Sequence, residues 1–122
     1  MPYRYRKSER IRKNSEFLAT MKGQRLSNDG LSLFYRKNDA GMSRIGISVG
    51  KKLGNAVKRN RLRRRLRDCI GRALGQTAPG YDLVFVARPE LGSRDFPQIL
   101  AAVTRILQRA KLTGAAPEGS KQ

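Results

Sequence analysis

The segment from residue 54 to residue 68, GNAVKRNRLRRRLRD, is the most cation-dense part of this chain. Seven of the ten residues from Lys58 to Arg67 are lysine or arginine. Its apolar residues recur at helical spacing and fall on one side of a helix: Leu62, Leu66, Cys69 and Ala73, with Ile70 at the edge. Because like charges at this density repel one another until they are neutralised, the segment predicts a helix over 55–74 that packs through its apolar side and presents cations to a polyanion.

The whole chain shares this positive charge. Its 122 residues include 27 Lys and Arg against 9 Asp and Glu, a formal net charge of +18. A field of this sign speeds encounters with nucleic acid and gives salt-dependent affinity without sequence selectivity. The apolar stretches are shorter than the roughly 20 residues that a membrane span needs, and the basic N-terminus lacks the apolar segment of a secretory signal. We therefore expect a cytoplasmic protein with a nucleic-acid partner and no membrane partner.

The side chains that commonly perform catalysis are missing or scattered. The sequence contains no histidine, the commonest general base, and its acids form no recognisable pair. Cys69 is the only cysteine and lies on the apolar side of the predicted helix, which favours a buried core residue over a nucleophile. We expect that the chain carries no bond-breaking step itself and holds no metal ion.

Periodicity predicts a single α/β (α+β) sandwich, a small mixed sheet with helices packed on it, in the order α-β-β-α-β-α. The strands 31–37 and 44–49 are expected to form an antiparallel hairpin, and the nearly all-apolar strand 82–87 should be central and buried. We place one domain at 14–111, after a basic arm over 1–13 and before a disordered tail over 112–122. The helices are expected at 14–21, 55–74 and 95–111.

The stretch from Ile45 to Asp68, IGISVGKKLGNAVKRNRLRRRLRD, resembles the signature of the protein subunit of bacterial ribonuclease P. That signature is a glycine-rich strand, two lysines, GNAV and an Arg-Asn-Arg helix with further cations. The similarity extends over residues 7–111 and includes the start KxxRIRKNSEF and the segment DLVFVARP. It implies a fold similar to ribosomal-protein-like α/β domains, in which strand 44–49, the basic helix and strand 82–87 form a left-handed βαβ crossover, a rare exception to the usual hand.

The resemblance also implies a division of labour. The family's enzyme is a ribonucleoprotein that removes the 5′ leader from precursor tRNA, and its RNA subunit holds the catalytic Mg²⁺ ions and performs the hydrolysis. A chain without catalytic groups fits a non-catalytic subunit that binds no metal tightly. Its expected partners are the catalytic RNA and precursor tRNA, with no DNA.

Two groups of residues follow from the resemblance. The family's Arg-Asn-Arg helix contacts the catalytic RNA, and the matching residues here are Arg59, Asn60, Arg61, Arg63, Arg64 and Arg67. Arginine suits this role because its planar fork binds phosphate oxygens bidentately. Of these, Arg64 and Arg67 should lie opposite the apolar side of the helix.

The second group belongs to a cleft, formed in the family by the first helix and a sheet face, that accommodates the single-stranded leader. Single strands bind by stacking on rings and by cations along the backbone. The matching candidates are Arg12, Lys13, Phe17, Met21, Phe34, Lys51 and Lys52. Met21 stands where the family often has an aromatic residue, and Tyr35 competes with Phe34 because a shift of one residue in the strand exchanges their faces. A core role for Phe17 and Met21 stays open.

Two other classes of protein share part of this pattern. A small basic ribosomal-type RNA-binding protein with no catalytic role has the same charge, size and fold class. A DNA-binding regulator would need base-reading side chains in a dimeric frame, which the sequence does not show. The Arg-Asn-Arg signature favours the ribonuclease P subunit over both.

Overall fold

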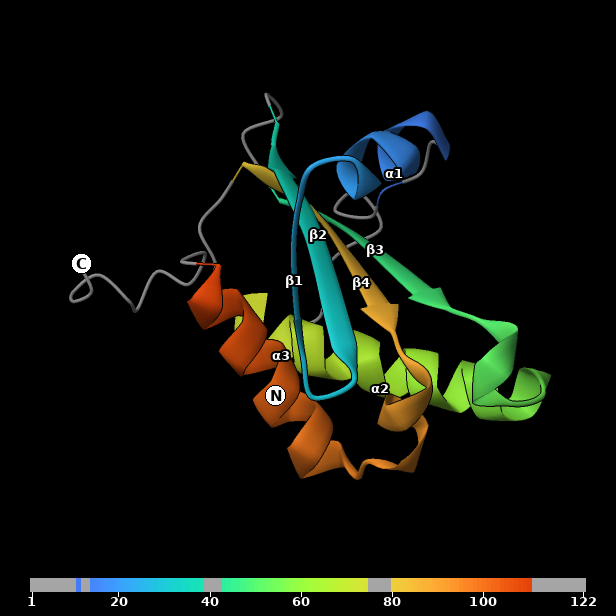
Figure 1. Ribbon diagram of the computed structural model, residues 1–122. Helices are drawn as coiled ribbons and strands as arrows, with labels where there is room; N and C mark the ends of the chain where they lie inside the picture. The colour runs from blue at the N-terminus through green and yellow to red at the C-terminus, as the bar shows by residue number, and fades with distance from the viewer. Residues whose placement is uncertain (1–10, 12–13, 39–42, 75–79, 111–122) are drawn as a thin grey trace.

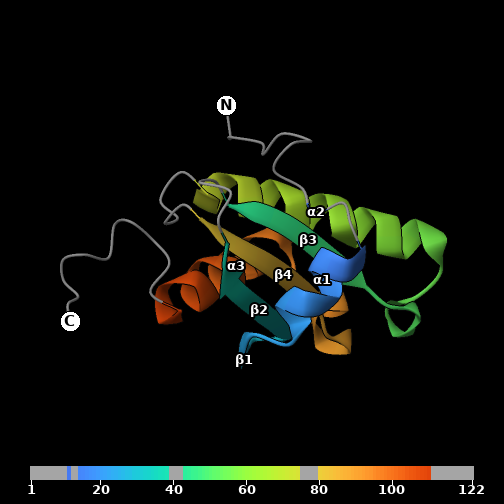
Figure 2. The same ribbon diagram turned by 90° about the horizontal axis from the view of Figure 1, so that it is seen from above.

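The computed structural model describes residues 11, 14–38, 43–74 and 80–110. Figures 1 and 2 show a twisted sheet with α2 and α3 on one face and α1 on the other. The elements, with two short 3₁₀ turns η2 and η3, are α1 (Asn14–Met21), β1 (Gln24–Asn28), β2 (Leu31–Lys37), β3 (Arg44–Val49), η2 (Lys51–Leu53), α2 (Ala56–Leu74), β4 (Tyr81–Ala87), η3 (Pro89–Ser93) and α3 (Phe96–Arg109).

The strands lie in the order β1-β2-β4-β3. The pairs β1–β2 and β2–β4 are antiparallel, and β3 pairs with β4 in parallel. In Figure 1 the arrows of β3 and β4 run the same way, β4 lies to the left of β3, and α2 passes behind the sheet. This connection is left-handed, as the resemblance implied, against the strong general preference for right-handed crossovers.

The predicted hairpin between strands 31–37 and 44–49 is wrong, because β4 lies between β2 and β3. On β4, Val84 and Phe85 point to opposite faces of the sheet and both are fully buried. A strand that is apolar on both faces is stable only where both faces are covered, so it takes a central position. The expectation of a buried central strand at 82–87 is therefore confirmed.

The hairpin partner of β2 is β1, a strand that was not predicted from the sequence. Asn28 pairs with Leu31 across a two-residue turn. The turn residues Asp29 and Gly30 have φ of 53° and 83°, the positive values that a type I′ hairpin turn requires. The observed order is thus α-β-β-β-α-β-α rather than α-β-β-α-β-α.

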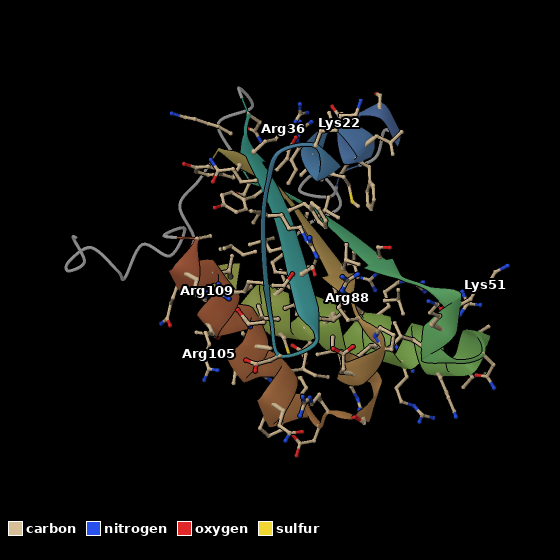
Figure 3. The ribbon with its side chains drawn as sticks, in the orientation of Figure 1. Lys22, Arg36, Lys51, Arg88, Arg105 and Arg109 are labelled. Atoms are coloured by element: carbon tan, nitrogen blue, oxygen red, sulfur yellow. The ribbon has the colours of Figure 1, made fainter. Side chains whose placement is uncertain are left out.

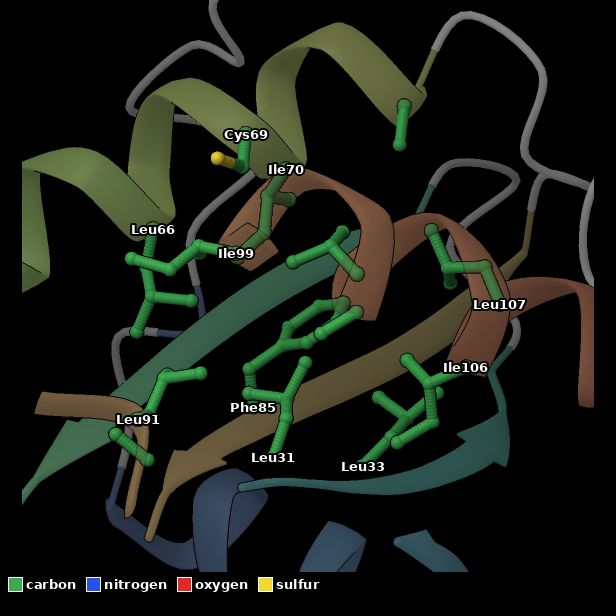
Figure 4. Close-up of a cluster of buried hydrophobic side chains, with 14 of the residues drawn as sticks. Leu31, Leu33, Leu66, Cys69, Ile70, Phe85, Leu91, Ile99, Ile106 and Leu107 are labelled. Atoms are coloured by element: carbon green, nitrogen blue, oxygen red, sulfur yellow. The ribbon is translucent and has the colours of Figure 1, made fainter. Parts of the chain in front are cut away.

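The hydrophobic core lies between the sheet and the pair α2–α3 (Figure 4). In the middle row of the sheet, Leu33 and Ile47 both pair with Phe85. The predicted apolar side of α2 is confirmed, with Leu62, Leu66, Cys69, Ile70 and Ala73 all buried. Burial raises the pKa of the Cys69 thiol to about 12, which keeps it neutral within the core.

Side-chain caps begin the two long helices. The Asn55 side chain accepts a hydrogen bond from the backbone N–H of Lys58 at 3.0 Å, as an N-cap residue of α2 does. Asp95 and Gln98 form a reciprocal capping box at 3.0 and 2.9 Å, so Asp95 precedes α3 rather than belonging to it. The cap of α2 matters for the site, because it fixes where the cations of that helix point.

Candidate RNA-binding surfaces

The side of α2 that faces away from the core carries a shallow hollow of about 570 Å³. It is lined by Val57, Asn60, Arg63, Arg64 and Arg67. Within it, Arg63 Nη1 donates a hydrogen bond to Asn60 Oδ1 at 2.6 Å, which leaves the amide N–H₂ of Asn60 as a donor toward the hollow. Four of the six residues predicted to contact catalytic RNA therefore lie together, and we call this group the outer hollow.

Arg61 lies apart from them. It lines a second hollow on the other flank of α2, where its neighbours include Lys58 and Arg65. Lys58 and Arg65 were not among the predicted contacts, although their spacing of seven residues places them on one side of a helix with Arg61. The basic helix thus presents cations on two flanks.

Two of the predicted arginines have donors without a partner. Among the described residues, Arg59 Nε and Arg67 Nε are buried and make no hydrogen bond. In the same part of the chain, no carboxylate forms an ion pair with any cation from Lys58 to Arg67. Buried N–H groups are almost always satisfied in a functioning protein, so this surface is suited to an external acceptor such as a phosphate oxygen.

The opposite face of the sheet carries the aromatic candidates. The Phe17 ring from α1 packs directly on Gly46 of β3, where an added Cβ would lie 3.0 Å from Phe17 Cε2. Gly46 and Phe34 both pair with Val84, so Phe34 lies in the same row and on the same face as this contact. Tyr35 points to the other face and packs against the core. We call the surface formed by Phe17, Met21 and Phe34 the α1 face.

Both phenylalanines are half-buried, and so is Met21. The guanidinium of Arg25 lies 5.8 Å from the centroid of the Phe34 ring, a cation–π contact that places a positive charge beside the aromatic group. Arg25 comes from β1, the strand missed in the sequence, and could not have been assigned to this face without it.

The cations predicted around the α1 face are less closely grouped. Arg12 and Lys13 lie outside the described residues. Lys51 and Lys52 are exposed in η2, and Figure 3 shows Lys51 at the end of β3 that is far from α1. Arg88, which was not predicted from the sequence as a binding residue, is exposed directly after β4 (Figure 3).

A buried ion-pair network lies where α1 meets the sheet. Its centre is Asp82, whose carboxylate accepts hydrogen bonds from Arg36, Asn38 and Arg44. Burial alone would raise the pKa of the Asp82 carboxyl, but the hydrogen bonds from Arg44 and Asn38 outweigh it and hold the pKa below its usual value. The same contact with Asp82 raises the pKa of Arg44. Asp82 is therefore a paired structural charge and is not free to act as a general base.

In the described part of the chain, no three His, Cys, Asp or Glu side chains are grouped so that they could hold a metal ion. Within those same residues, none of the helices combines the length and the apolar character needed to cross a membrane.

Comparison with known proteins identifies the family to which this fold and its basic helix belong. The model of the family described as Ribonuclease P matches residues 5–111. A ribonuclease P protein component from Clostridium novyi is 41% identical over 110 residues, covering 88% of this chain and 97% of that protein. One from Roseiflexus castenholzii is 46% identical over 95 residues, covering 71% of this chain and 78% of that protein.

Solved structures give the same result for the fold. The RNase P protein of Staphylococcus aureus, as a mutant with defective mRNA degradation activity, superimposes with a TM-score of 0.79 at 31% identity, covering 87% of this chain and 91% of that one. The RNase P protein of Thermotoga maritima, in complex with 1-(4-fluorophenyl)-2-thiourea, gives a TM-score of 0.76 at 32% identity, covering 82% and 98%. Together with the outer hollow and the left-handed crossover, these matches show that the chain belongs to the family of bacterial ribonuclease P protein components.

Proposed function

We propose that this subunit of ribonuclease P binds the catalytic RNA through the outer hollow of α2 and the 5′ leader of precursor tRNA through the α1 face. In this proposal it works in the cytoplasm and assists Mg²⁺-dependent endonucleolytic removal of the leader. Hydrolysis takes place on the RNA subunit, which holds the Mg²⁺ ions. The protein's side chains bind and orient the RNA.

The observation that carries the proposal is the outer hollow itself. It gathers three arginines and an asparagine, and the buried Nε of Arg67 has no partner among the described residues. A guanidinium plane with free N–H groups fits two oxygens of one phosphate, and the amide of Asn60 suits a sugar hydroxyl or a base edge. RNA presents all of these acceptors along a single backbone.

The α1 face supports the second half of the proposal. Phe17 and Phe34 are half-buried rings on one face of the sheet, with the cation of Arg25 beside Phe34. Unpaired bases stack on such rings, while nearby cations neutralise the backbone that joins them. A folded tRNA body has few unpaired bases to offer, so this surface should favour the leader.

The absence of histidine from the sequence supports a non-catalytic role. Asp82, the buried carboxylate, is occupied by three partners. Without an available general base, the protein contributes affinity and orientation rather than proton transfer.

Reconstitution with the catalytic RNA tests the proposal. The double variant Arg64→Ala and Arg67→Ala should weaken the affinity for catalytic RNA by about 10- to 100-fold, because two charge-assisted contacts are lost. The matched control is Arg105→Gln with Arg109→Gln, which removes two cations from α3, on a different helix (Figure 3). Protein freed of RNA should not remove leaders, but it should lower the Mg²⁺ concentration at which the RNA removes them.

Equal losses of affinity in the two double variants would mean that only net charge matters, and would contradict a site on α2. Circular dichroism of both variants checks that the fold is retained.

A further inference from the structure

Asp82 lies at the start of β4 with no exposed surface, yet it carries a charge. Arg44 holds it in a bidentate contact, with Nε 2.9 Å from Oδ1 and Nη2 3.1 Å from Oδ2. Asn38 donates to Oδ1 at 2.7 Å, and Arg36 Nη2 donates to Oδ2 at 3.2 Å. The bidentate contact fixes the plane of the Arg44 guanidinium, because both of its nitrogens are tied to a group that cannot move.

The third nitrogen of Arg44 reaches α1. Arg44 Nη1 donates to Glu16 Oε2 at 2.9 Å, and both side chains are only about a quarter exposed, at 22% and 25%. Arg44 and Asp82 face each other in the register of β3 and β4, so the Arg44 guanidinium lies on the side of the sheet that α1 covers. One side chain therefore joins β3, β4 and α1.

In the part of the chain that the structure describes, few other polar contacts hold α1 in place. With eight residues, α1 is too short to be stable without tertiary contacts. Leu18 is 53% exposed, and the buried hydroxyl of Thr20 donates to Glu16 O within the same helix. The position of α1 over the sheet thus depends mainly on packing and on the contact between Glu16 and Arg44.

The next residue after Glu16 is Phe17, whose ring packs on Gly46. Gly46 is two residues after Arg44 on β3 and on the same face of the sheet. The ion pair and the ring contact are therefore neighbouring anchor points on one strand. A rotation of α1 that broke the ion pair between Glu16 and Arg44 would also move the Phe17 ring away from Gly46.

We propose that Arg44 is a positioning residue for leader binding: held in place by the buried Asp82, it fixes α1 through Glu16 and so sets how the Phe17 ring is presented on the α1 face. This inference rests on the proposed function of that face. Arg44 itself touches no RNA in the proposal, and its effect passes through α1.

The test compares Glu16→Ala with Asp29→Asn in the reconstituted holoenzyme. Glu16→Ala removes the link to α1 but leaves the contact between Arg44 and Asp82 intact. Asp29→Asn removes one carboxylate as well, and breaks an exposed ion pair of similar length, Asp29 to Arg105 at 3.0 Å, away from α1. Asparagine also accepts the positive φ of that turn position.

Glu16→Ala should lower the affinity for precursor tRNA about 3- to 10-fold relative to the affinity for mature tRNA, as expected for a coupling of modest size. Loss of a negative charge by itself would raise both affinities, so the expected change has the opposite sign to the charge effect. Arg44→Lys should behave like Glu16→Ala, because an ammonium group cannot hold both carboxylates in a fixed plane. Asp29→Asn should leave the ratio of the two affinities unchanged.

One α-proton of Gly46 reports the position of the Phe17 ring, because a Cβ built in its place would lie 3.0 Å from Phe17 Cε2. In Glu16→Ala the chemical shift of this Gly46 proton should move toward the value expected when no aromatic ring is nearby, while the resonances of Leu83 and Phe85 in the core keep their chemical shifts. If Glu16→Ala keeps both the Gly46 shift and the affinity ratio of the unchanged protein, the inference is wrong. Equal losses for precursor and mature tRNA would also overturn it, since they would indicate a general structural role.

A holoenzyme with unchanged protein that binds precursor and mature tRNA equally well would instead contradict the proposed function of the α1 face. If Arg44→Lys fails to fold, Glu16→Ala still tests the role of Arg44, because the Glu16 side chain makes few buried contacts and its loss should leave the protein folded.

Discussion

Replacing Phe17 with alanine separates a binding role from a core role. The ring packs on Gly46 and is only half-buried, so part of it is left exposed to a base. Losing one base–ring stack should cost about 1–3 kcal/mol, a factor of about 5 to 150 in affinity for precursor tRNA. Truncating a fully buried phenylalanine costs about 3–5 kcal/mol of stability. A half-buried one should cost about half as much, so the variant should still fold.

The assay measures three quantities for one variant: the affinity for precursor tRNA, the affinity for mature tRNA, and the melting temperature. The chain offers a matched control in Phe96→Ala. Phe96 is also half-buried, lies at the start of α3, and has the guanidinium of Arg72 5.1 Å from its ring centroid. Both variants should melt at a lower temperature, but only Phe17→Ala should reduce the preference for precursor over mature tRNA.

Equal weakening of both RNAs by Phe17→Ala, with a lower melting temperature, would refute the reasoning. It would show that Phe17 is an ordinary core residue whose loss reduces the amount of folded protein.

Three further measurements check other parts of the structure. If catalytic RNA is held by about five phosphate contacts, a plot of the logarithm of its affinity against the logarithm of salt concentration should have a slope of about −4. The double variant Arg64→Ala and Arg67→Ala should make this slope less steep by about 2. The pKa of Asp82 is lower in the folded protein than its ordinary value near 3.9, so its stabilising effect is complete above that value and is lost as the pH falls through the folded pKa. Acid unfolding of Asp82→Asn, followed by circular dichroism, should therefore depend less on pH below about 4. Because the pKa of Cys69 is raised to about 12, its thiol should react with iodoacetamide at pH 8 only as fast as the protein unfolds, and reaction of the folded protein at the rate of a free thiol would contradict its burial.

The sequence predicted the helices better than the sheet. The apolar side of α2 follows from a 3.6-residue repeat, which is a local property and survives in the folded protein. Strand pairing is not local: β2 and β3 look like hairpin partners until β4, which comes later in the chain, is placed between them. β1 has the sequence QRLSN and no clear alternation, so only the Asp29-Gly30 turn after it signalled a strand there.

The candidate site divides in the same way. The four predicted residues that line the outer hollow could be grouped by helical spacing alone. The pair Arg44 and Asp82 could not, since 38 residues separate them and Arg44 is one cation among 27. One signal was present: an aspartate at the start of an almost entirely apolar strand needs a buried partner, because an unpaired charge inside a core is too costly. Identifying that partner required the fold.

The two edges of the sheet bear on how the protein behaves at high concentration. An uncovered strand edge offers free N–H and C=O groups to any other chain, and is a common start of aggregation. At one edge β1 is five residues long and mostly exposed and polar, which makes it a poor template. At the other edge the backbone N–H of Ile11 donates to Ile45 O at 2.8 Å, so Ile11 occupies part of the open side of β3. Shortening the protein from its N-terminus past residue 11 would uncover an edge that carries Ile45 and Ile47. The purified subunit would then self-associate through β3, even though it would keep most of its net charge of +18.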